Sequence, residues 1–298
     1  MSTSKRGWAA FAVAALALSL LAACAPDHID APAGAAPLRY RDSVFPSIDT
    51  AKDLQYGSAV GVTGNQEALR LDVYQPQGDT AALRPALVWV HGGGFSGGDK
   101  ATSVSTVLAR NFARRGYVTV SINYRLLVPS GCGGSATSEC TKAAIEAIHD
   151  GQAAVRWLRA NASTFRIDPN RIGIGGESAG AIVAYGVGVL SDQPGTSGNP
   201  EQPSNVAAWV SISGGAPGGA FVSPGDAPGY LFSGTADRTV PYQWSVETKN
   251  ALLAAQVPVV FRTFQGAGHV PFAEYGDVMD EQSASFFYRY LDVAHLPG

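Results

Sequence analysis

The sequence predicts an α/β fold in which a mostly parallel sheet is covered by helices on both faces. Short apolar segments rich in β-branched and aromatic residues recur along the chain, as is typical of buried strands. Segments with helical spacing separate the later ones, and strands that alternate with helices form parallel sheets. The chain has 298 residues, of which 46% are hydrophobic and 15% charged, so it is long enough to bury one large core.

Eight strands are expected, over residues 54–62, 69–74, 86–90, 117–122, 171–174, 206–212, 230–232 and 257–264. Five helices are expected, over residues 103–116, 143–162, 178–190, 242–256 and 277–291, because apolar residues recur there at helical spacing. The Asp168-Pro169-Asn170 stretch is expected to turn the chain before the strand at 171–174. In open sheets of this kind, sites form outside the carboxyl ends of the strands.

Charge and composition exclude some classes of function. The net charge is −3 and the sequence contains no basic run, whereas nucleic-acid-binding proteins carry a basic patch or stripe. No Cys/His cluster has the spacing of a metal site. The glycine-rich stretch at 91–98 is not followed by Gly-Lys-Ser/Thr, so it is not interpreted as a phosphate loop. We therefore expect no nucleic acid, metal or cofactor.

Residues 1–23 are expected to be a signal peptide. Lys5 and Arg6 precede a 16-residue apolar run, which is short for a membrane span. The run ends in Leu-Ala-Ala-Cys24, which resembles the lipobox of bacterial lipoproteins. This resemblance implies that Cys24 becomes an acylated first residue that anchors the protein to a membrane surface, in the periplasm, at the outer membrane or on the cell surface. Secretion after cleavage near this point is the alternative.

The segment that follows is expected to be a tether. Residues 24–53 are rich in Ala and Pro and show no sustained period, which suits a chain that leads onto the surface of a domain. One domain, over residues 54–298, is then the simplest interpretation of what remains.

Cys132 and Cys140 are expected to form a disulfide. They flank a Gly/Ser-rich loop, and disulfides persist outside the cytoplasm. The bridge would close a nine-residue ring and contribute about 2.5 kcal/mol in the loop-entropy model. Two free thiols or a metal pair are the alternatives, although no neighbouring Cys or His supports a metal.

The pattern Gly-x-Ser-x-Gly occurs twice, around Ser178 in GESAG at 176–180 and around Ser96 in GFSGG at 94–98. A serine nucleophile of this type lies on a sharp strand-to-helix turn, with glycines on both sides. Ser178 lies directly between an expected strand and an expected helix. In contrast, Gly97, Gly98 and Asp99 intervene between Ser96 and its helix. The context therefore favours Ser178.

A serine hydroxyl needs a base that removes its proton and a carboxylate that orients the base. Among the five histidines, His269 follows the last expected strand in a glycine-flanked loop. His28, His149 and His295 lie in the tether, within a helix and near the chain end. An exposed loop histidine without a catalytic role is the alternative for His269.

Asp237 is the expected carboxylate, because it lies in the turn that follows the seventh strand. Asp226 precedes that strand and belongs at the opposite edge of the sheet. Asp277 and Asp280 follow His269 and would break the chain order Ser, Asp, His. A simple helix cap near Val240 is the alternative for Asp237.

The negative charge of a tetrahedral intermediate needs preorganised donors, and the loss of one donor costs about 3 kcal/mol. The stretch WVHGGGFSGGD follows a strand, and its glycines let backbone N–H groups approach a substrate. Ser96 belongs to this stretch, which explains the second Gly-x-Ser-x-Gly match.

With HGGG at 91–94, GESAG at 176–180, Asp237 and His269 in this order, the chain resembles the α/β-hydrolase superfamily and, within it, the carboxylesterase and hormone-sensitive-lipase-like esterases. The resemblance covers nearly all of residues 54–298. It implies an α/β-hydrolase fold with a mostly parallel eight-stranded sheet. It assigns Ser178 as nucleophile, His269 as base and then acid, and Asp237 as the group that orients His269. The oxyanion donors implied are the N–H groups of Gly93, Gly94 and Ala179.

The chain departs from hormone-sensitive-lipase-like esterases where these carry a helical cap. Residues 214–228 are short and rich in Gly and Pro, and the tether lacks helical periodicity, so we expect little or no cap. An open cleft favours short-chain, aryl or polymer-borne esters, as in feruloyl or acetyl esterases, over long-chain lipids. A serine peptidase, an acyltransferase and a non-catalytic tethered binding protein are the alternatives, because fold alone does not decide function. The oligomeric state is not predicted.

Overall fold

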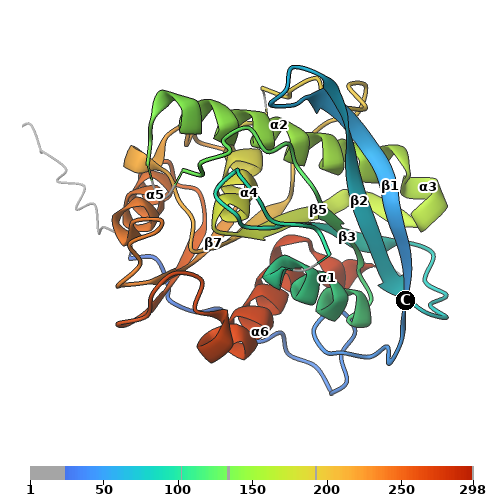
Figure 1. Ribbon diagram of the computed structural model, residues 1–298. Coiled ribbons are helices and arrows are strands. Elements are labelled where there is room, and N and C mark those ends of the chain that lie inside the picture. The colour runs from blue at the N-terminus through green and yellow to red at the C-terminus, as the bar shows by residue number, and fades with distance from the viewer. Residues whose placement is uncertain (1–23, 102, 133–134, 192, 297–298) are drawn as a thin grey trace, which may run out of the picture.

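A computed structural model of the chain describes residues 24–101, 103–132, 135–191 and 193–296 (Figure 1). The predicted signal peptide at 1–23 lies outside the described residues. Among the helices of the described ranges, none has the length and apolar character needed to cross a bilayer.

An eight-stranded sheet forms the centre of the molecule, in the spatial order β1-β2-β4-β3-β5-β6-β7-β8. β2 pairs antiparallel with β1 and with β4, and the other neighbours pair in parallel. The strands are β1 (Ile48–Val60), β2 (Gln66–Pro76), β3 (Arg84–Val90), β4 (Val118–Ile122), β5 (Ile167–Glu177), β6 (Ala208–Ile212), β7 (Gly229–Gly234) and β8 (Val259–Phe264). The predicted α/β architecture with a mostly parallel eight-stranded sheet is confirmed.

Helices cover both faces of this sheet: α1 and α6 lie on one face, and α2, α4 and α5 on the other (Figure 1). They are α1 (Val104–Arg114), α2 (Ser138–Ala160), α3 (Ala162–Phe165), α4 (Ala179–Val189), α5 (Tyr242–Ala254) and α6 (Phe272–Tyr290), with short 3₁₀ turns η1 (Pro217–Gly219) and η2 (Val293–His295). The expected helix at 277–291 therefore begins five residues earlier.

The central strand β3 shows how the sequence builds two cores. All seven of its residues are buried, and side chains of a strand point alternately to opposite faces. Val88 and Val90 pack in the core that includes α2 and α4. Leu87 and Trp89 pack in the core that includes α1 and α6. A continuous apolar run is what a strand covered on both faces requires.

Two element predictions are corrected by the structure. β1 begins at Ile48, six residues before the expected start, because its first half is a polar, exposed edge that is held by backbone pairing with β2 and shows no apolar pattern. The predicted turn at 168–170 is part of β5. It forms an irregularity in which Ile167 pairs with Arg84 and Ile172 with Ala86, so the extra residues bulge without ending the strand.

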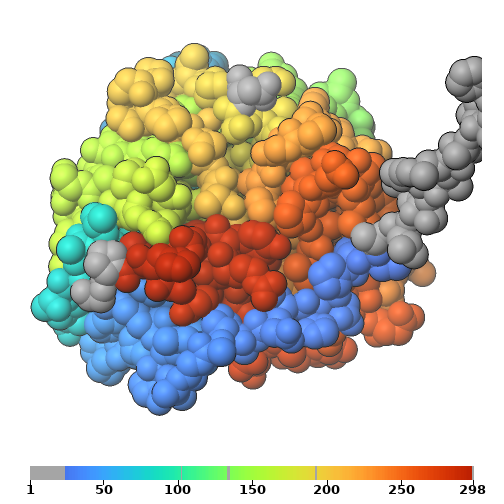
Figure 2. Space-filling view, turned by 180° about the vertical axis from the view of Figure 1, so that it is seen from behind, coloured from blue at the N-terminus to red at the C-terminus, as the bar shows by residue number. Residues whose placement is uncertain are grey.

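The segment expected to be a tether packs against the domain instead of leading away from it. The Phe261 N–H donates to the Pro26 carbonyl oxygen at 2.8 Å, and the Gln282 side chain bonds both the N–H and the carbonyl of Ile29. Ile29 and Tyr40 are buried. Figure 2 shows this segment in blue, running beside α6 in red across the back of the molecule. The expected boundary at residue 53 falls inside β1.

Candidate active site

Ser178 occupies the single residue between the end of β5 and the start of α4. Its backbone angles, φ 53° and ψ −119°, lie in a region that L residues avoid at a cost of about 1–3 kcal/mol. The Ser178 N–H donates to the Ile212 carbonyl oxygen at 2.9 Å, which ties the turn to the neighbouring strand β6. The turn is therefore the sharp strand-to-helix connection that the sequence predicted.

The glycines of GESAG are required by close packing. A methyl group added at Gly176 would lie 2.3 Å from the Gly180 carbonyl oxygen, and one added at Gly180 would lie 2.1 Å from the Val90 carbonyl oxygen. Both distances are far shorter than a van der Waals contact, and both neighbours are backbone atoms that cannot move freely. These two glycines let the first turn of α4 pass directly beside the end of β3.

Three side chains expected at different strand ends meet at this turn. His269 Nε2 lies 2.8 Å from Ser178 Oγ, and His269 Nδ1 lies 2.7 Å from Asp237 Oδ2. Ser178 follows β5, Asp237 follows β7 and His269 follows β8. The hydroxyl can donate to the imidazole, which in turn donates from its other nitrogen to the carboxylate. This is the geometry that transfers a proton away from a serine hydroxyl.

Asp237 is fully buried, whereas the His269 side chain is 22% exposed. The second carboxylate oxygen of Asp237, Oδ1, accepts from the backbone N–H groups of Thr239 and Val240 at 2.9 and 3.1 Å. The capping role considered for Asp237 therefore coexists with its bond to His269, because each uses a different oxygen.

The rival residues lie elsewhere. Asp280 makes a two-pronged ion pair with Arg115, and Asp226 precedes β7. His28 bonds Asp27 at 2.7 Å. The other rivals are placed on helices, namely Asp277 on α6, His149 on α2 and His295 in η2.

The HGGG stretch follows β3 and turns its backbone with positive φ angles at Gly93 (+122°) and Gly94 (+61°). Its carbonyl groups are held by donors: Gly92 O lies 2.6 Å from His91 Nδ1, and Gly93 O accepts from Ser96 Oγ at 3.0 Å. A peptide unit is planar with its C=O and N–H in opposite directions. Fixing these two carbonyls therefore fixes the N–H groups of Gly93 and Gly94, the expected oxyanion donors. The third expected donor, Ala179, is the first residue of α4.

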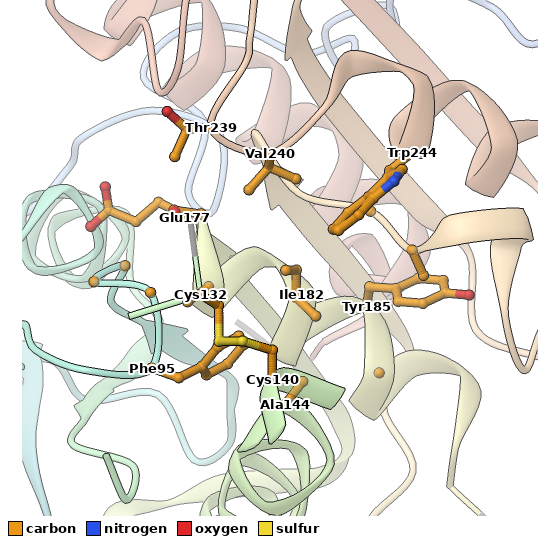
Figure 3. Close-up of a pocket in the computed structure, with 18 of the residues that line it drawn as sticks. Phe95, Cys132, Cys140, Ala144, Glu177, Ile182, Tyr185, Thr239, Val240 and Trp244 are labelled. Atoms are coloured by element: carbon orange, nitrogen blue, oxygen red, sulfur yellow. A yellow bond between two sulfur atoms is a disulfide. The ribbon is translucent and has the colours of Figure 1, made fainter. Parts of the chain in front are cut away.

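Glu177 connects the two glycine-rich turns. Its carboxylate is buried and faces the backbone N–H groups of Ser105, Gly92 and Val104. Burial raises the pKa of Glu177 above its usual value, and these N–H groups act in the opposite direction. In Figure 3 its carboxylate points away from the cavity side where Trp244 and Tyr185 lie. Glu177 is thus a contact between the Ser178 turn and the HGGG stretch.

A cavity of about 760 Å³ opens beside Ser178 and His269. Its walls are mostly apolar and come from the loop of the disulfide, from α2, α4 and α5, and from the residues around η1 (Figure 3). The larger lining side chains are Phe95, Ile145, Ile148, Ile182, Tyr185, Phe221 and Trp244. Phe221 is 52% exposed, so it stands at the rim.

The expected disulfide between Cys132 and Cys140 is present and both of its residues line the cavity. Cys24 is a free, exposed cysteine. Among the described residues there is no group of three or more His, Cys, Asp or Glu side chains that could hold a metal ion.

Known proteins with similar sequences or structures support this description of the fold. A family model described as BD-FAE matches residues 71–217, just under half of the chain. A solved esterase from Thermogutta terrifontis with bound butyrate superposes with a TM-score of 0.65 at 21% identity, over 80% of this chain and 95% of that chain. The chain has the α/β-hydrolase fold.

Other proteins that this chain resembles carry esterase names. Fumonisin B1 esterase of Sphingopyxis macrogoltabida is 34% identical over 144 residues, which are 47% of this chain and 26% of that protein. A truncated carbohydrate esterase from gut microbiota superposes with a TM-score of 0.64 at 20% identity, over 88% of this chain and 100% of that chain. The chain spans about a quarter of the length of the curated relatives that it matches first.

The sequence analysis missed one residue that positions the candidate site. Ser213 follows β6 with φ 58°, and its hydroxyl accepts from the Val270 N–H at 2.9 Å. This bond holds the loop that carries His269. Its sequence position could have indicated this role, because Ser213 comes directly after a strand, at the same edge of the sheet as Ser178.

Proposed function

We propose that the protein is a serine carboxylesterase that hydrolyses short-chain or aryl carboxylic esters through an acyl-enzyme. The observation that carries this proposal is the continuous chain from Ser178 Oγ to His269 at 2.8 Å and from His269 to the buried Asp237 at 2.7 Å. The relative and the two solved structures named above are called esterases, which supports the same activity.

In the proposed reaction, Ser178 Oγ attacks the ester carbonyl carbon while its proton passes to His269 Nε2. The carbonyl oxygen becomes negative and receives hydrogen bonds from the N–H groups of Gly93, Gly94 and Ala179. The C–O bond then breaks, and the alcohol leaves with the proton from His269. A water molecule, deprotonated by His269, attacks the acyl-enzyme; the acyl–Oγ bond then breaks, His269 returns the proton to Ser178 Oγ, and the acid is released. Asp237 keeps the imidazole oriented and stabilises its charged form.

The lining of the cavity supports uncharged acyl groups. Its larger walls are aromatic and aliphatic, and the charged groups among the described lining residues, apart from His269, are the carboxylates of Asp99 and Glu177. An anionic ester would meet repulsion and no cationic partner there. Tyr185, Phe221 and Trp244 offer aromatic faces, which suit an aryl group.

Esters carried on a carbohydrate polymer are a second candidate substrate class. A neighbour in fold is titled a carbohydrate esterase, and no helical cap covers the described part of the site: the connection between β6 and β7 contains only η1. An acetylated or cinnamoylated sugar could therefore approach with most of its polymer outside the cavity.

The experiment is a substrate panel with the purified protein that lacks residues 1–23. It includes p-nitrophenyl esters of increasing chain length, cinnamoyl esters, acetylated sugars, a matched p-nitroanilide, and alcohol acceptors that report acyl transfer. The proposal requires ester cleavage by the parent protein and its loss in Ser178→Ala. No ester cleavage, or cleavage that survives Ser178→Ala, would refute it. Amide cleavage would favour a peptidase, and ester product with alcohols an acyltransferase.

We also propose that the mature protein is a lipoprotein anchored through Cys24. The exposure of Cys24 and the short distance along the chain to Pro26, which is bonded to β8, support a domain held close to the membrane. Cys24→Ser is expected to move the protein from the membrane fraction to the soluble fraction. Unchanged membrane association would contradict acylation at this residue.

A further inference from the structure

The HGGG stretch is held by two sets of hydrogen bonds. One set lies within the stretch, and the other comes from a segment that is distant in the sequence. Gly92 and Gly93 bond within the stretch, through His91 and Ser96. The next two carbonyl groups bond outside it. Gly94 O accepts from the Cys132 N–H, and Phe95 O accepts from the Val128 N–H, each at 3.2 Å. We call residues 91–98 the oxyanion loop. Its part around Gly94 and Phe95 is therefore held by residues 128–132.

That chain lies between β4 and α2, and it buries Val128 and Cys132 in the core beside the oxyanion loop. The Gly131 N–H donates to Val128 O inside this segment, and the Ser135 N–H, just after it, donates to Cys132 O. The contact with the oxyanion loop is close: a methyl group added at Gly131 would lie 3.2 Å from Ser96 Oγ. The disulfide from Cys132 to Cys140 cross-links this segment to α2.

Cys140 provides a rigid attachment point. It is buried in the first turn of α2, and the Thr137 side chain caps the helix by accepting from the Cys140 N–H. Further along, α2 carries the fully buried Asp150, which bonds Arg125 at the start of the same connection. The disulfide therefore links the donor at Cys132 to a helix that is fixed in the core. Figure 3 shows the bridge among the side chains that line the cavity, which also include Phe95 and Ile182.

We propose that the Cys132–Cys140 disulfide is a positioning element for the oxyanion donors, beyond its contribution to stability. It holds the Cys132 N–H against Gly94 O and so fixes the peptide unit that joins Gly94 to Phe95. This unit shares the Cα of Gly94 with the unit that carries the proposed donor N–H of Gly94. Without the bridge the 128–132 segment gains freedom, the bond to Gly94 O is lost for part of the time, and the donors are displaced when the oxyanion forms. This inference rests on the proposed esterase function.

The expected consequence is a loss of kcat with little change in KM, because oxyanion donors act on the transition state more than on the bound ester. The loss of a whole donor costs about 100- to 1,000-fold in kcat. A donor that is only displaced for part of the time should cost less, about tenfold or more. A bridge that served merely as a cavity wall would change KM and the preference for acyl length instead.

The test compares the parent protein with the double variant Cys132→Ala/Cys140→Ala, both carrying Cys24→Ser so that no other thiol reacts. The Cys132 backbone N–H is retained. kcat and KM are measured with p-nitrophenyl acetate, together with the affinity for an alkyl trifluoromethyl ketone, whose adduct with a serine carries an oxyanion. Ser138→Ala is the matched control, since Ser138 is exposed and lies in the same ring.

We expect the double variant to remain folded, to lose about tenfold or more in kcat, and to lose affinity for the ketone by a similar factor, while Ser138→Ala matches the parent. The parent reduced with dithiothreitol, with two thiols titrated, should show the same loss and recover on reoxidation. A folded double variant with kcat within twofold of the parent, or a change in KM alone, would overturn the inference. Unfolding of both the variant and the reduced parent would also overturn it, because the bridge would then serve folding. An inactive parent would instead refute the esterase proposal itself.

Discussion

The two Gly-x-Ser-x-Gly stretches share a sequence pattern but have different backbone conformations and different partners for the serine hydroxyl. In residues 176–180 the serine lies between β5 and α4, its own backbone is strained, and its hydroxyl faces His269. In residues 94–98 the positive φ angles lie at residues before and after the serine, and the Ser96 hydroxyl folds back onto Gly93 O.

The difference teaches that the position of a motif between elements decides its chemistry. A serine with no residue between strand and helix must project at the tip of the turn, where partners on other strands reach it. A serine followed by several loop residues can satisfy its hydroxyl locally. The predictions below separate the two turns by what each is expected to do.

The largest effect is expected for Asp237→Asn, because it changes the partner of His269, the base that serves Ser178 and not Ser96. The Asn side-chain oxygen would keep the bonds from Thr239 and Val240, so its NH₂ group would face His269 and impose the wrong tautomer. We expect kcat to fall by about 10⁴-fold, with the fold retained. Steady-state kinetics and circular dichroism measure both. A loss smaller than tenfold would show that the contact with His269 is not used in the reaction.

The next effect separates the glycines of the two turns. Gly180→Ala would place a methyl group 2.1 Å from Val90 O, whereas a methyl group at Gly97 meets nothing within 4 Å. Overpacking against a core costs about 1–3 kcal/mol, and backbone atoms yield less than side chains. We therefore expect Gly180→Ala to lose about 3 kcal/mol of unfolding free energy and Gly97→Ala less than about 1 kcal/mol. Urea denaturation measures this, and equal losses would contradict the packing argument.

A smaller effect is expected for Ser96→Ala. Gly93 O would lose the bond from Ser96 Oγ but keep those from the N–H groups of Ser96 and Gly97. Because two of three donors remain, kcat should fall by about two- to tenfold, with KM nearly unchanged. An effect as large as that of Ser178→Ala would reverse the assignment of the two serines.

The smallest effect concerns pH and the residue that holds Gly92. Burial lowers the pKa of His91 below its usual value of 6.5, so the unfolded chain takes up a proton near pH 6.5 while the folded protein does not. The unfolded state then binds more protons, and stability falls as the pH drops below 6.5. Between pH 7 and 5.5 this contributes a loss of up to about 1 kcal/mol. His91→Gln should remove this contribution in urea titrations at the two pH values, and an identical pH dependence in both proteins would contradict it.

The sheet, its helices and the meeting of Ser178, Asp237 and His269 could be predicted from the sequence, because each depends on local patterns and on chain order. A buried parallel strand such as β3 is a continuous apolar run, and residues that follow parallel strands share one edge. What could not be predicted depends on pairing and contacts without a side-chain signal. The polar first half of β1 forms only because β2 is beside it.

The segment at 25–47 is a second case. Its attachment uses backbone groups of Pro26 and Ile29 together with partners in β8 and α6, and no periodicity in its own sequence reports them. The role of Glu177 was equally hidden, because its N–H partners belong to turns that are distant in the sequence.

The most direct test of the central claim is to identify which serine reacts with an activated phosphoryl ester. The protein is treated with paraoxon, digested, and the peptides that carry Ser178 and Ser96 are compared by mass spectrometry. The account predicts one diethylphosphoryl group, located on Ser178, with activity lost in proportion and no labelling in His269→Ala. Labelling of Ser96, or labelling of Ser178 that does not depend on His269, would contradict it.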